Sequence, residues 1–158
     1  VGIARKVRLT PEGLGHPLYE GKPAAFDSPC IHLDEVTHIP DGGVVLASNN
    51  HSRVQALSFT HRGGTFWGVQ YHPEFDLFHM AKLAVVYVGL MIEGGFYRRV
   101  EDAERHAEKM IALHEDPSRF DLAWFLGVER DVLDPDIRLR EVRNWIERKV
   151  LPRKAART

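Results

Sequence analysis

The hydrophobic pattern of this 158-residue chain changes its period near residue 75, and this change restricts the folds that are open to the chain. Before that point, short apolar runs alternate with clusters of Gly, Pro, Asn and Asp; the runs cover residues 4–9, 24–26, 30–33, 44–47, 54–59 and 65–71. Runs of this length between turn residues are typical of strands. The sequence therefore predicts that the first half of the chain is rich in β-structure.

Beyond residue 75 the apolar residues recur about every 3.6 positions, which is the period of an amphipathic helix. We expect helices over residues 75–92, 100–114, 121–126 and 137–150. Gly127 is a typical C-terminal stop, and Asp134 before Pro135 is a typical N-cap. On the last helix we expect Trp145 and Ile146 to pack against the core, as apolar stripes usually do.

The composition excludes several classes of partner. A formal net charge of −1 gives no electrostatic case for binding nucleic acid or an anionic membrane. The most apolar stretch, residues 83–92, is far shorter than the roughly 20 residues that a membrane span needs. With a single cysteine, Cys30, and no signal peptide at its start, the chain is predicted to be a cytoplasmic protein without nucleic-acid or membrane partners.

Nine histidines raise the question of a metal site. His32, His38, His51 and His61 are scattered through predicted turns and strands, and no His or Cys pair has the spacing of a zinc motif. We therefore expect neither a metal site nor a cofactor.

The stretch WGVQYHPEF, residues 67–75, ends a predicted buried strand on two ionisable groups. In an extended chain His72 and Glu74 point to the same face, with Cα atoms roughly 6.5 Å apart. A glutamate spans that gap and accepts a hydrogen bond from one imidazole nitrogen. Pro73 stiffens the backbone between them. The pair is thus suited to proton transfer, with the histidine as base and the carboxylate holding its ring.

A purely structural interpretation of the same residues is also open. If the strand simply turns into the next helix, Glu74 lies near the N-terminus of that helix, where the helix dipole favours a negative charge. The local motif alone leaves both interpretations open.

Several motifs together resemble the class I, triad-type glutamine amidotransferases. GVQYHPEF, residues 68–75, is similar to the signature that carries the catalytic His and Glu of that family. Residues 31–36, IHLDEV, with the Pro-Asp-Gly turn at 40–42, resemble its Ser-His-x-Asp-x-Val segment and the turn that follows, with Ile31 in place of the Ser. Residues 45–48 and 54–56 match the two strands before the signature. The resemblance is nearest to GMP-synthase-like glutaminase domains.

This resemblance implies an α/β fold, the C-terminal part of a flavodoxin-like three-layer architecture followed by helices. We expect residues 1–95 to form the C-terminal portion of the amidotransferase domain, and residues 96–158 to form a helical extension. GMP synthase itself is rejected, because the chain has no Ser-Gly-Gly-x-Asp-Ser phosphate loop.

The resemblance also implies roles for particular residues. His72 becomes the general base and acid, and Glu74 its orienting carboxylate. The backbone of Leu33 and Asp34 is expected to bind the substrate, glutamine, whereas His32 has a structural or site-forming role. An ammonia-accepting synthetase is the partner implied.

The nucleophile of the family is a cysteine in a Gly-x-Cys-x-Gly elbow, where glycines relieve a strained turn. Cys30 has a proline before it, a β-branched residue after it and no glycine nearby, so we do not expect it to be the nucleophile. The elbow is expected upstream of Val1. The chain is therefore predicted to be N-terminally truncated, inactive as a glutaminase by itself, and poorly soluble because part of its sheet is uncovered.

Two alternatives to glutamine hydrolysis stay open. One is a binding or regulatory module that keeps the fold without catalysis. The other is a hydrolase of γ-glutamyl compounds, which uses the same triad on another substrate. A comparison of glutamine with γ-glutamyl amines as substrates separates the two enzymes.

Overall fold

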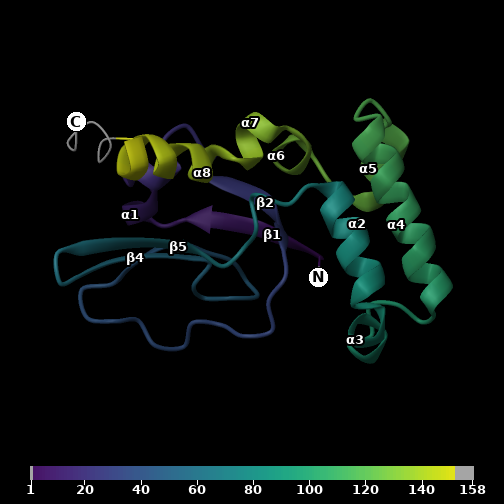
Figure 1. Ribbon diagram of the computed structural model, residues 1–158, viewed down its shortest axis with the longest axis horizontal. Coiled ribbons are helices and arrows are strands. Elements are labelled where there is room, and N and C mark those ends of the chain that lie inside the picture. The colour runs from purple at the N-terminus through teal and green to yellow at the C-terminus, as the bar shows by residue number, and fades with distance from the viewer. Residues whose placement is uncertain (1, 152–158) are drawn as a thin grey trace.

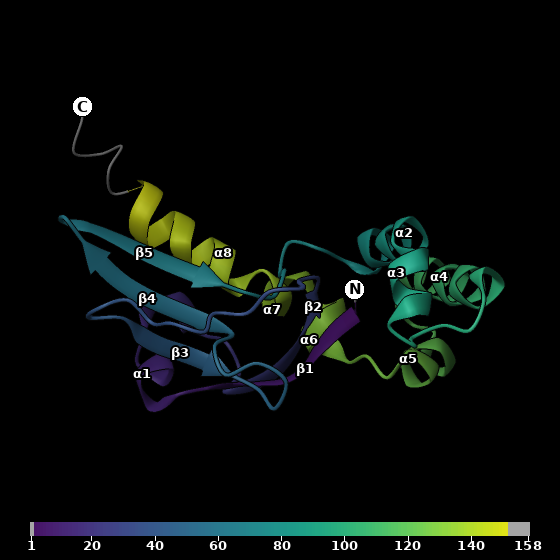
Figure 2. The same ribbon diagram turned by 90° about the horizontal axis from the view of Figure 1, so that it is seen from below.

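The computed structural model describes residues 2–151; Val1 and residues 152–158, the outer ends of the two predicted units, lie outside the described part. A curled sheet forms one side of the molecule, and a group of helices lies beside it (Figure 1). In the view from below, the C-terminal helices run along the sheet while α2 to α5 stand apart from it (Figure 2). The α/β class expected from the sequence is confirmed.

The sheet is built from five strands in the order β2-β1-β3-β4-β5, and each neighbouring pair is antiparallel. The strands are β1 (Gly2–Leu9), β2 (Ala25–Cys30), β3 (Val44–Ser48), β4 (Ala56–His61) and β5 (Gly64–Val69). The turn residues between the predicted runs 54–59 and 65–71 form a hairpin in which Arg62 and Gly63 both have positive φ. Two such residues are the requirement of the hairpin turn that matches the twist of a sheet.

The predicted strand over residues 30–33 is wrong, because β2 ends at Cys30. Beyond that residue the backbone oxygens face side chains instead of a neighbouring strand. The carbonyl of Ile31 lies 3.2 Å from the ring of His72, and the carbonyl of Asp34 accepts a hydrogen bond from Gln70. The Asp34 carbonyl thus has a side-chain partner in place of a strand ladder, as an irregular segment requires.

Most helices are short. They form two sets along the chain, one before β2 and one after β5. The N-terminal set comprises α1 (Pro11–Leu14) and the 3₁₀ turn η1 (Pro17–Tyr19). The remaining helices are α2 (Leu77–Val86), α3 (Val88–Glu93), α4 (Val100–Glu115), α5 (Phe120–Leu126), α6 (Arg130–Leu133), α7 (Pro135–Arg138), α8 (Arg140–Trp145) and the π-helical turn η2 (Ile146–Val150).

The predicted helix over residues 75–92 is interrupted at Tyr87, whose ψ of 19° falls outside the helical range. The β-branched pair Val85-Val86 and the glycine at 89 lower the helix propensity on either side of the break. Two predicted helix ends are confirmed. Gly127 closes α5 in the left-handed conformation, and the Asp134 side chain caps α7.

Two hydrophobic cores hold the molecule together. The first lies inside the curl of the sheet and includes Val7, Phe26, Leu46 and Tyr71. The second joins the helices and is formed by the buried residues Leu77, Leu113, Val128 and Val132. Since α2 and α4 both contribute to the second core, this core spans residue 95, and the division of the chain there stays a prediction.

The expectation that Trp145 and Ile146 pack against the core is wrong: 46% and 38% of their surfaces are exposed. The helix α8, which ends at Trp145, instead buries the polar residues Glu141 and Asn144 against the sheet side of the molecule. The groups that face α8 there are a tyrosine hydroxyl, a lysine ammonium and backbone carbonyls, which need polar partners.

None of the helices within residues 2–151 combines the length and the apolar character that crossing a membrane requires.

Candidate active site

The candidate site lies where the curled sheet closes on itself. Beyond β5, the Gln70 amide donates to the Gln55 carbonyl at 2.8 Å, which continues the line of the strand. The His72 amide then donates to the Pro29 carbonyl of β2 at 2.7 Å. Because β2 and β5 are the two ends of the sheet order, this bond brings the sheet edges together at His72.

At this closure, the ring Nδ1 of His72 lies 2.7 Å from a carboxylate oxygen of Glu74. The contact has the geometry that the two-residue spacing and Pro73 predict. Both side chains reach solvent, with 32% of the histidine and 53% of the glutamate exposed. The catalytic roles expected for these two residues stay predictions.

The structural interpretation places Glu74 as the acid at a helix N-terminus. In the structure a different acid, Asp76, is the cap of that helix. The helix α2 begins at Leu77, and the Asp76 carboxylate accepts the hydrogen bond from the His79 amide that caps it. Burial alone would raise the pKa of Asp76, but the hydrogen bonds from His79 and the nearby imidazole of His114 bring it below its usual range. Glu74 is left to face His72.

The other faces of the His72 ring are also defined. Nε2 lies 3.2 Å from the Ile31 carbonyl, and the ring stacks on Phe75 with centroids 4.7 Å apart and planes within 11°. Both ring nitrogens donate at once only when the imidazole carries two protons. In the neutral ring that donates to Glu74 from Nδ1, Nε2 has a lone pair that is free to accept a proton.

The predicted substrate-binding segment lies against the strand that leads to His72. The Asp34 carbonyl accepts a hydrogen bond from the Gln70 side chain at 2.9 Å, and the His32 ring nitrogen lies 2.8 Å from the same oxygen. The Leu33 side chain is 91% exposed and makes the segment a projecting loop. The structural or site-forming role of His32 and substrate binding by Leu33 and Asp34 both stay predictions.

A cavity of about 300 Å³ opens beside the imidazole and is lined by His32, Gln70 and His72, among others. One further residue of its wall, Gln55, is only 1% exposed, and its side-chain oxygen has no hydrogen-bond partner among residues 2–151. The sequence places Gln55 on one face of a predicted strand but indicates no function for it. The available signal was a polar residue, Gln55, between two apolar ones near the start of the predicted strand over residues 54–59.

Cys30 lies at the end of β2 and is half-buried. Burial raises the pKa of its thiol, which disfavours the thiolate that a nucleophile requires. It lines a cavity of about 410 Å³ together with Arg5 and Asn49. This cavity shares His32 and Gln55 with the one beside His72, but His72 is absent from its lining and Cys30 is absent from the lining of the other. Burial and position both argue against Cys30 as the nucleophile.

No three or more His, Cys, Asp or Glu side chains in the part of the chain that the structure describes are grouped so that they could hold a metal ion. His32, His38, His51 and His61, the four histidines scattered through the first half of the chain, do not form such a group.

Comparison with known proteins gives one family match and several similar proteins. Residues 2–85 match the family model described as glutamine amidotransferase class-I. This range contains the sheet, the loop of residues 31–40 and the His72–Glu74 pair, and it ends within α2.

Of the similar proteins, the gamma-glutamyl-L-1-hydroxyisopropylamide hydrolase of a Pseudomonas species is 34% identical over 153 residues, which are 95% of this chain and 50% of that protein. The glutamine-hydrolyzing GMP synthase of Thermosipho africanus is 40% identical over 58 residues, 37% of this chain and 11% of that protein. One subunit of the glutamine-hydrolyzing GMP synthase of Methanocaldococcus jannaschii is 35% identical over 57 residues, 36% of this chain and 29% of its own length. The chain thus spans half the length of the first relative and less of the other two.

Proposed function

The chain belongs to the class I glutamine amidotransferase family, and from this premise we propose that it supplies the proton-transfer residues of an enzyme that hydrolyses a γ-glutamyl amide. The observation that carries the proposal is the 2.7 Å contact between His72 and Glu74 at the rim of a cavity. A histidine whose second nitrogen is held by a carboxylate is the usual base beside a thiol or hydroxyl nucleophile.

In the proposed reaction, Nε2 of His72 takes the proton of a nucleophilic thiol. The thiolate attacks the carbonyl carbon of the amide, and the same proton passes from Nε2 to the leaving nitrogen as the C–N bond breaks. Water, deprotonated by His72, then attacks the thioester carbonyl. The C–S bond breaks, glutamate is released, and the proton on Nε2 returns to the thiolate. Glu74 keeps Nδ1 protonated throughout and stabilises the positive ring that forms between the two transfers.

We propose that the thiol comes from residues outside this chain. The only cysteine, Cys30, does not line the cavity beside His72 and has a raised pKa, as described above. The chain also spans only half the length of the Pseudomonas hydrolase, which leaves room in such a protein for a segment that carries the nucleophile.

Glutamine is the first candidate substrate, since the family and the GMP synthase relatives carry it in their names. In that case the backbone of Leu33 and Asp34 binds the glutamine, and the released ammonia requires an acceptor, for which a synthetase is the partner we propose. An N-substituted γ-glutamyl amide is the second candidate. It is favoured by the Pseudomonas hydrolase, whose similarity extends through the C-terminal helices, whereas the two GMP synthase matches cover about a third of this chain.

The proposal is tested on the longer protein, by which we mean a polypeptide that contains this chain together with the proposed segment that carries the nucleophile. Glutamate release is measured with glutamine and γ-glutamyl-isopropylamide as parallel substrates. We expect hydrolysis of at least one substrate, and a loss of about 10²- to 10⁴-fold in kcat on His72→Asn. The 158-residue chain alone is expected to release no glutamate from either.

The opposite results are equally informative. A longer protein that binds γ-glutamyl amides but hydrolyses neither is a non-catalytic module, which would refute the enzymatic proposal. Glutamate release by the chain alone would refute the external nucleophile.

A further inference from the structure

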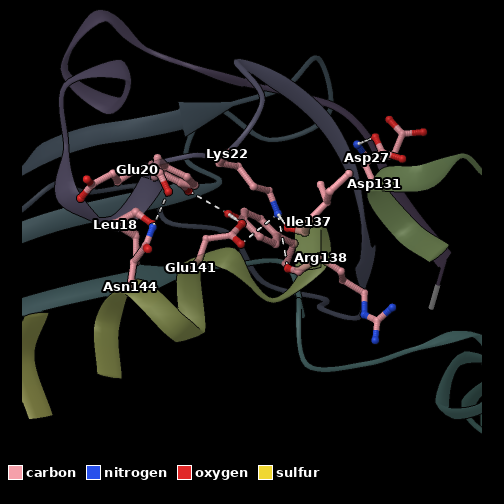
Figure 3. Close-up of polar contacts among 11 residues, drawn as sticks. Leu18, Glu20, Lys22, Asp27, Asp131, Ile137, Arg138, Glu141 and Asn144 are labelled. Atoms are coloured by element: carbon pink, nitrogen blue, oxygen red, sulfur yellow. Dashed lines mark hydrogen bonds and ion pairs between the residues drawn. The ribbon is translucent and has the colours of Figure 1, made fainter. Parts of the chain in front are cut away.

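A buried polar cluster joins the C-terminal helix α8 to the residue that precedes His72. We define the buried tyrosine cluster as Tyr19, Lys22, Tyr71 and Glu141, four residues whose polar ends meet beneath α8. All four residues are at least nine-tenths buried. Figure 3 shows Glu141 on its helix facing Lys22, with Asn144 one turn further along facing Leu18.

The hydrogen bonds of the cluster run in one direction. The Tyr71 hydroxyl donates to one oxygen of Glu141 at 2.6 Å, so the 2.8 Å contact between the two tyrosines must be a donation from Tyr19 to Tyr71. Burial raises the pKa of the Tyr71 hydroxyl well above its ordinary value, which keeps this donor protonated at neutral pH.

Lys22 completes the cluster. Its ammonium donates to the second oxygen of Glu141 at 2.9 Å and to the carbonyls of Ile137 and Arg138 at 2.9 and 3.3 Å. The three protons of the ammonium thus have three acceptors, and both carboxylate oxygens of Glu141 are used. A fully satisfied polar cluster of this kind holds one arrangement of its members more strictly than apolar packing does.

The position of Tyr71 links this cluster to the candidate site. Side chains alternate along an extended segment, so the ring of Tyr71 enters the core while that of His72 stands at the rim. His72 is therefore held between a proline, whose φ is fixed, and a tyrosine whose ring packs on Phe26 and whose hydroxyl is bound at α8.

A second contact from the C-terminal helices holds strand β2, whose Pro29 carbonyl accepts the hydrogen bond from the His72 amide. The Asp131 carboxylate of α6 accepts a hydrogen bond from the Asp27 amide of β2 at 2.6 Å. Figure 3 shows this pair at the edge of the same group of contacts. The strand that it holds ends in Pro29 and Cys30, and the Pro29 carbonyl binds the His72 amide.

From these contacts we propose that Glu141 is a positioning residue for the candidate active site: it holds the Tyr71 hydroxyl and thereby fixes the orientation of the His72 ring. This inference rests on the proposed function of His72 as the base. It gives the helices beyond residue 85, where the family match ends, a role in the reaction that the family domain does not itself supply.

The test uses four variants of the longer protein. Tyr71→Phe removes the hydroxyl, and Glu141→Ala removes the acceptor. Tyr19→Phe is the matched control for the first, because it deletes one hydroxyl from the same cluster and leaves the bond between Tyr71 and Glu141 in place. Glu141→Gln is the control for the second, because it loses the charge that Lys22 needs but keeps an oxygen for Tyr71.

Two readouts are compared for each variant. The first is the NMR signal of the His72 ring proton shared with Glu74, which needs no catalysis. The second is the division of the kinetic effect between kcat and KM. For Tyr71→Phe and Glu141→Ala we expect the ring-proton signal to broaden and kcat to fall roughly tenfold with KM nearly unchanged, because small displacements of a reacting group are costly. Tyr19→Phe and Glu141→Gln are expected to keep both.

An unchanged ring-proton signal in Tyr71→Phe would overturn the inference. So would a loss of kcat in Glu141→Gln as large as that in Glu141→Ala, since the effect would then follow stability and not the Tyr71 bond. If the unmodified protein hydrolyses neither substrate, the proposed function fails, and the ring-proton signals still decide whether Glu141 positions His72.

Discussion

Two contacts between a basic side chain and a carboxylate, Lys22 with Glu141 and His72 with Glu74, have nearly the same separation and very different surroundings. Lys22 and Glu141 lie 2.9 Å apart with side chains 1% and 2% exposed. His72 and Glu74 lie 2.7 Å apart with side chains 32% and 53% exposed. In the first pair every hydrogen-bonding group is used, whereas in the second the neutral ring keeps a lone pair on Nε2, which lies 3.2 Å from the Ile31 carbonyl. Burial, and not distance, distinguishes a pair that holds structure from one suited to transferring protons.

A third carboxylate lies between these extremes. Asp76 is 24% exposed, caps α2 and lies 2.8 Å from the ring of His79. The three carboxylates therefore form a series of increasing exposure, and the comparison predicts that the effect of removing each interaction on the free energy of unfolding decreases along it.

The largest effect is expected for Lys22→Ala, which leaves the Glu141 carboxylate buried without its counter-charge. We expect the free energy of unfolding to fall by about 3–5 kcal/mol. Urea denaturation followed by circular dichroism measures the change. In the double variant Lys22→Met with Glu141→Gln, both charges are removed together, and more than half of this loss should be recovered. A loss below about 1 kcal/mol for the single variant would contradict the contrast with the exposed pair.

An intermediate effect is expected for Asp76→Ala. The variant loses the side-chain cap of α2, which is worth about 1 kcal/mol at a typical helix N-terminus. Asp76→Asn is the control, because its amide oxygen still accepts the hydrogen bond from the His79 amide. The same denaturation measurement at neutral pH should rank the alanine variant below the asparagine variant and both above Lys22→Ala.

The pH dependence of the free energy of unfolding measures the contribution of Asp76, the middle member of the series. The pKa of Asp76 is lower in the folded chain than its value of about 3.9 in an unfolded chain. Its contribution is therefore fully present above about pH 4 and is lost as the pH falls through the lowered pKa. Asp76→Asn should flatten the curve of unfolding free energy against pH in that acidic range. Equal slopes in the two proteins would show that this carboxylate does not contribute.

The smallest effect on unfolding is expected for Glu74→Gln, at most about 1 kcal/mol, because exposed pairs stabilise folded proteins only weakly. Its effect on hydrolysis is expected to be large, about a hundredfold or more in kcat, since the amide no longer supports a positive imidazole. Denaturation and glutamate release are measured on the same preparation. If Glu74→Gln lost stability but kept kcat, the contact between His72 and Glu74 would hold structure and would not serve the reaction, contrary to the comparison.

The features that the sequence predicted well are those set by neighbours along the chain. The contact between His72 and Glu74 follows from a two-residue spacing around a proline, and the hairpin at Arg62 and Gly63 from local turn chemistry. The glycine that closes α5 follows a similarly local rule. In each case the backbone geometry is determined within a few residues, so no knowledge of the rest of the fold is needed.

The features that the sequence did not predict depend on distant partners. Trp145 was expected inside because apolar residues usually are, yet Glu141 and Asn144 take the buried face of α8. That choice is made by a tyrosine hydroxyl 70 residues away and by the carbonyls of Leu18 and Glu20, and no local pattern signals it. The burial of Gln55 is not signalled locally for the same reason, since it depends on how the sheet curls.

The separation along the chain between the two halves of the tyrosine cluster also sets an order of events during synthesis. His72 meets Glu74 within two residues, whereas Tyr71 meets Glu141 only across 70 and Lys22 meets it across 119. Contacts that close long loops form after local ones, and a chain emerging from the ribosome has no Glu141 until its last helices are made. The contact between His72 and Glu74 is thus formed first and anchored last, so a nascent chain that stops short of α8 carries these two residues without the tyrosine cluster that anchors Tyr71.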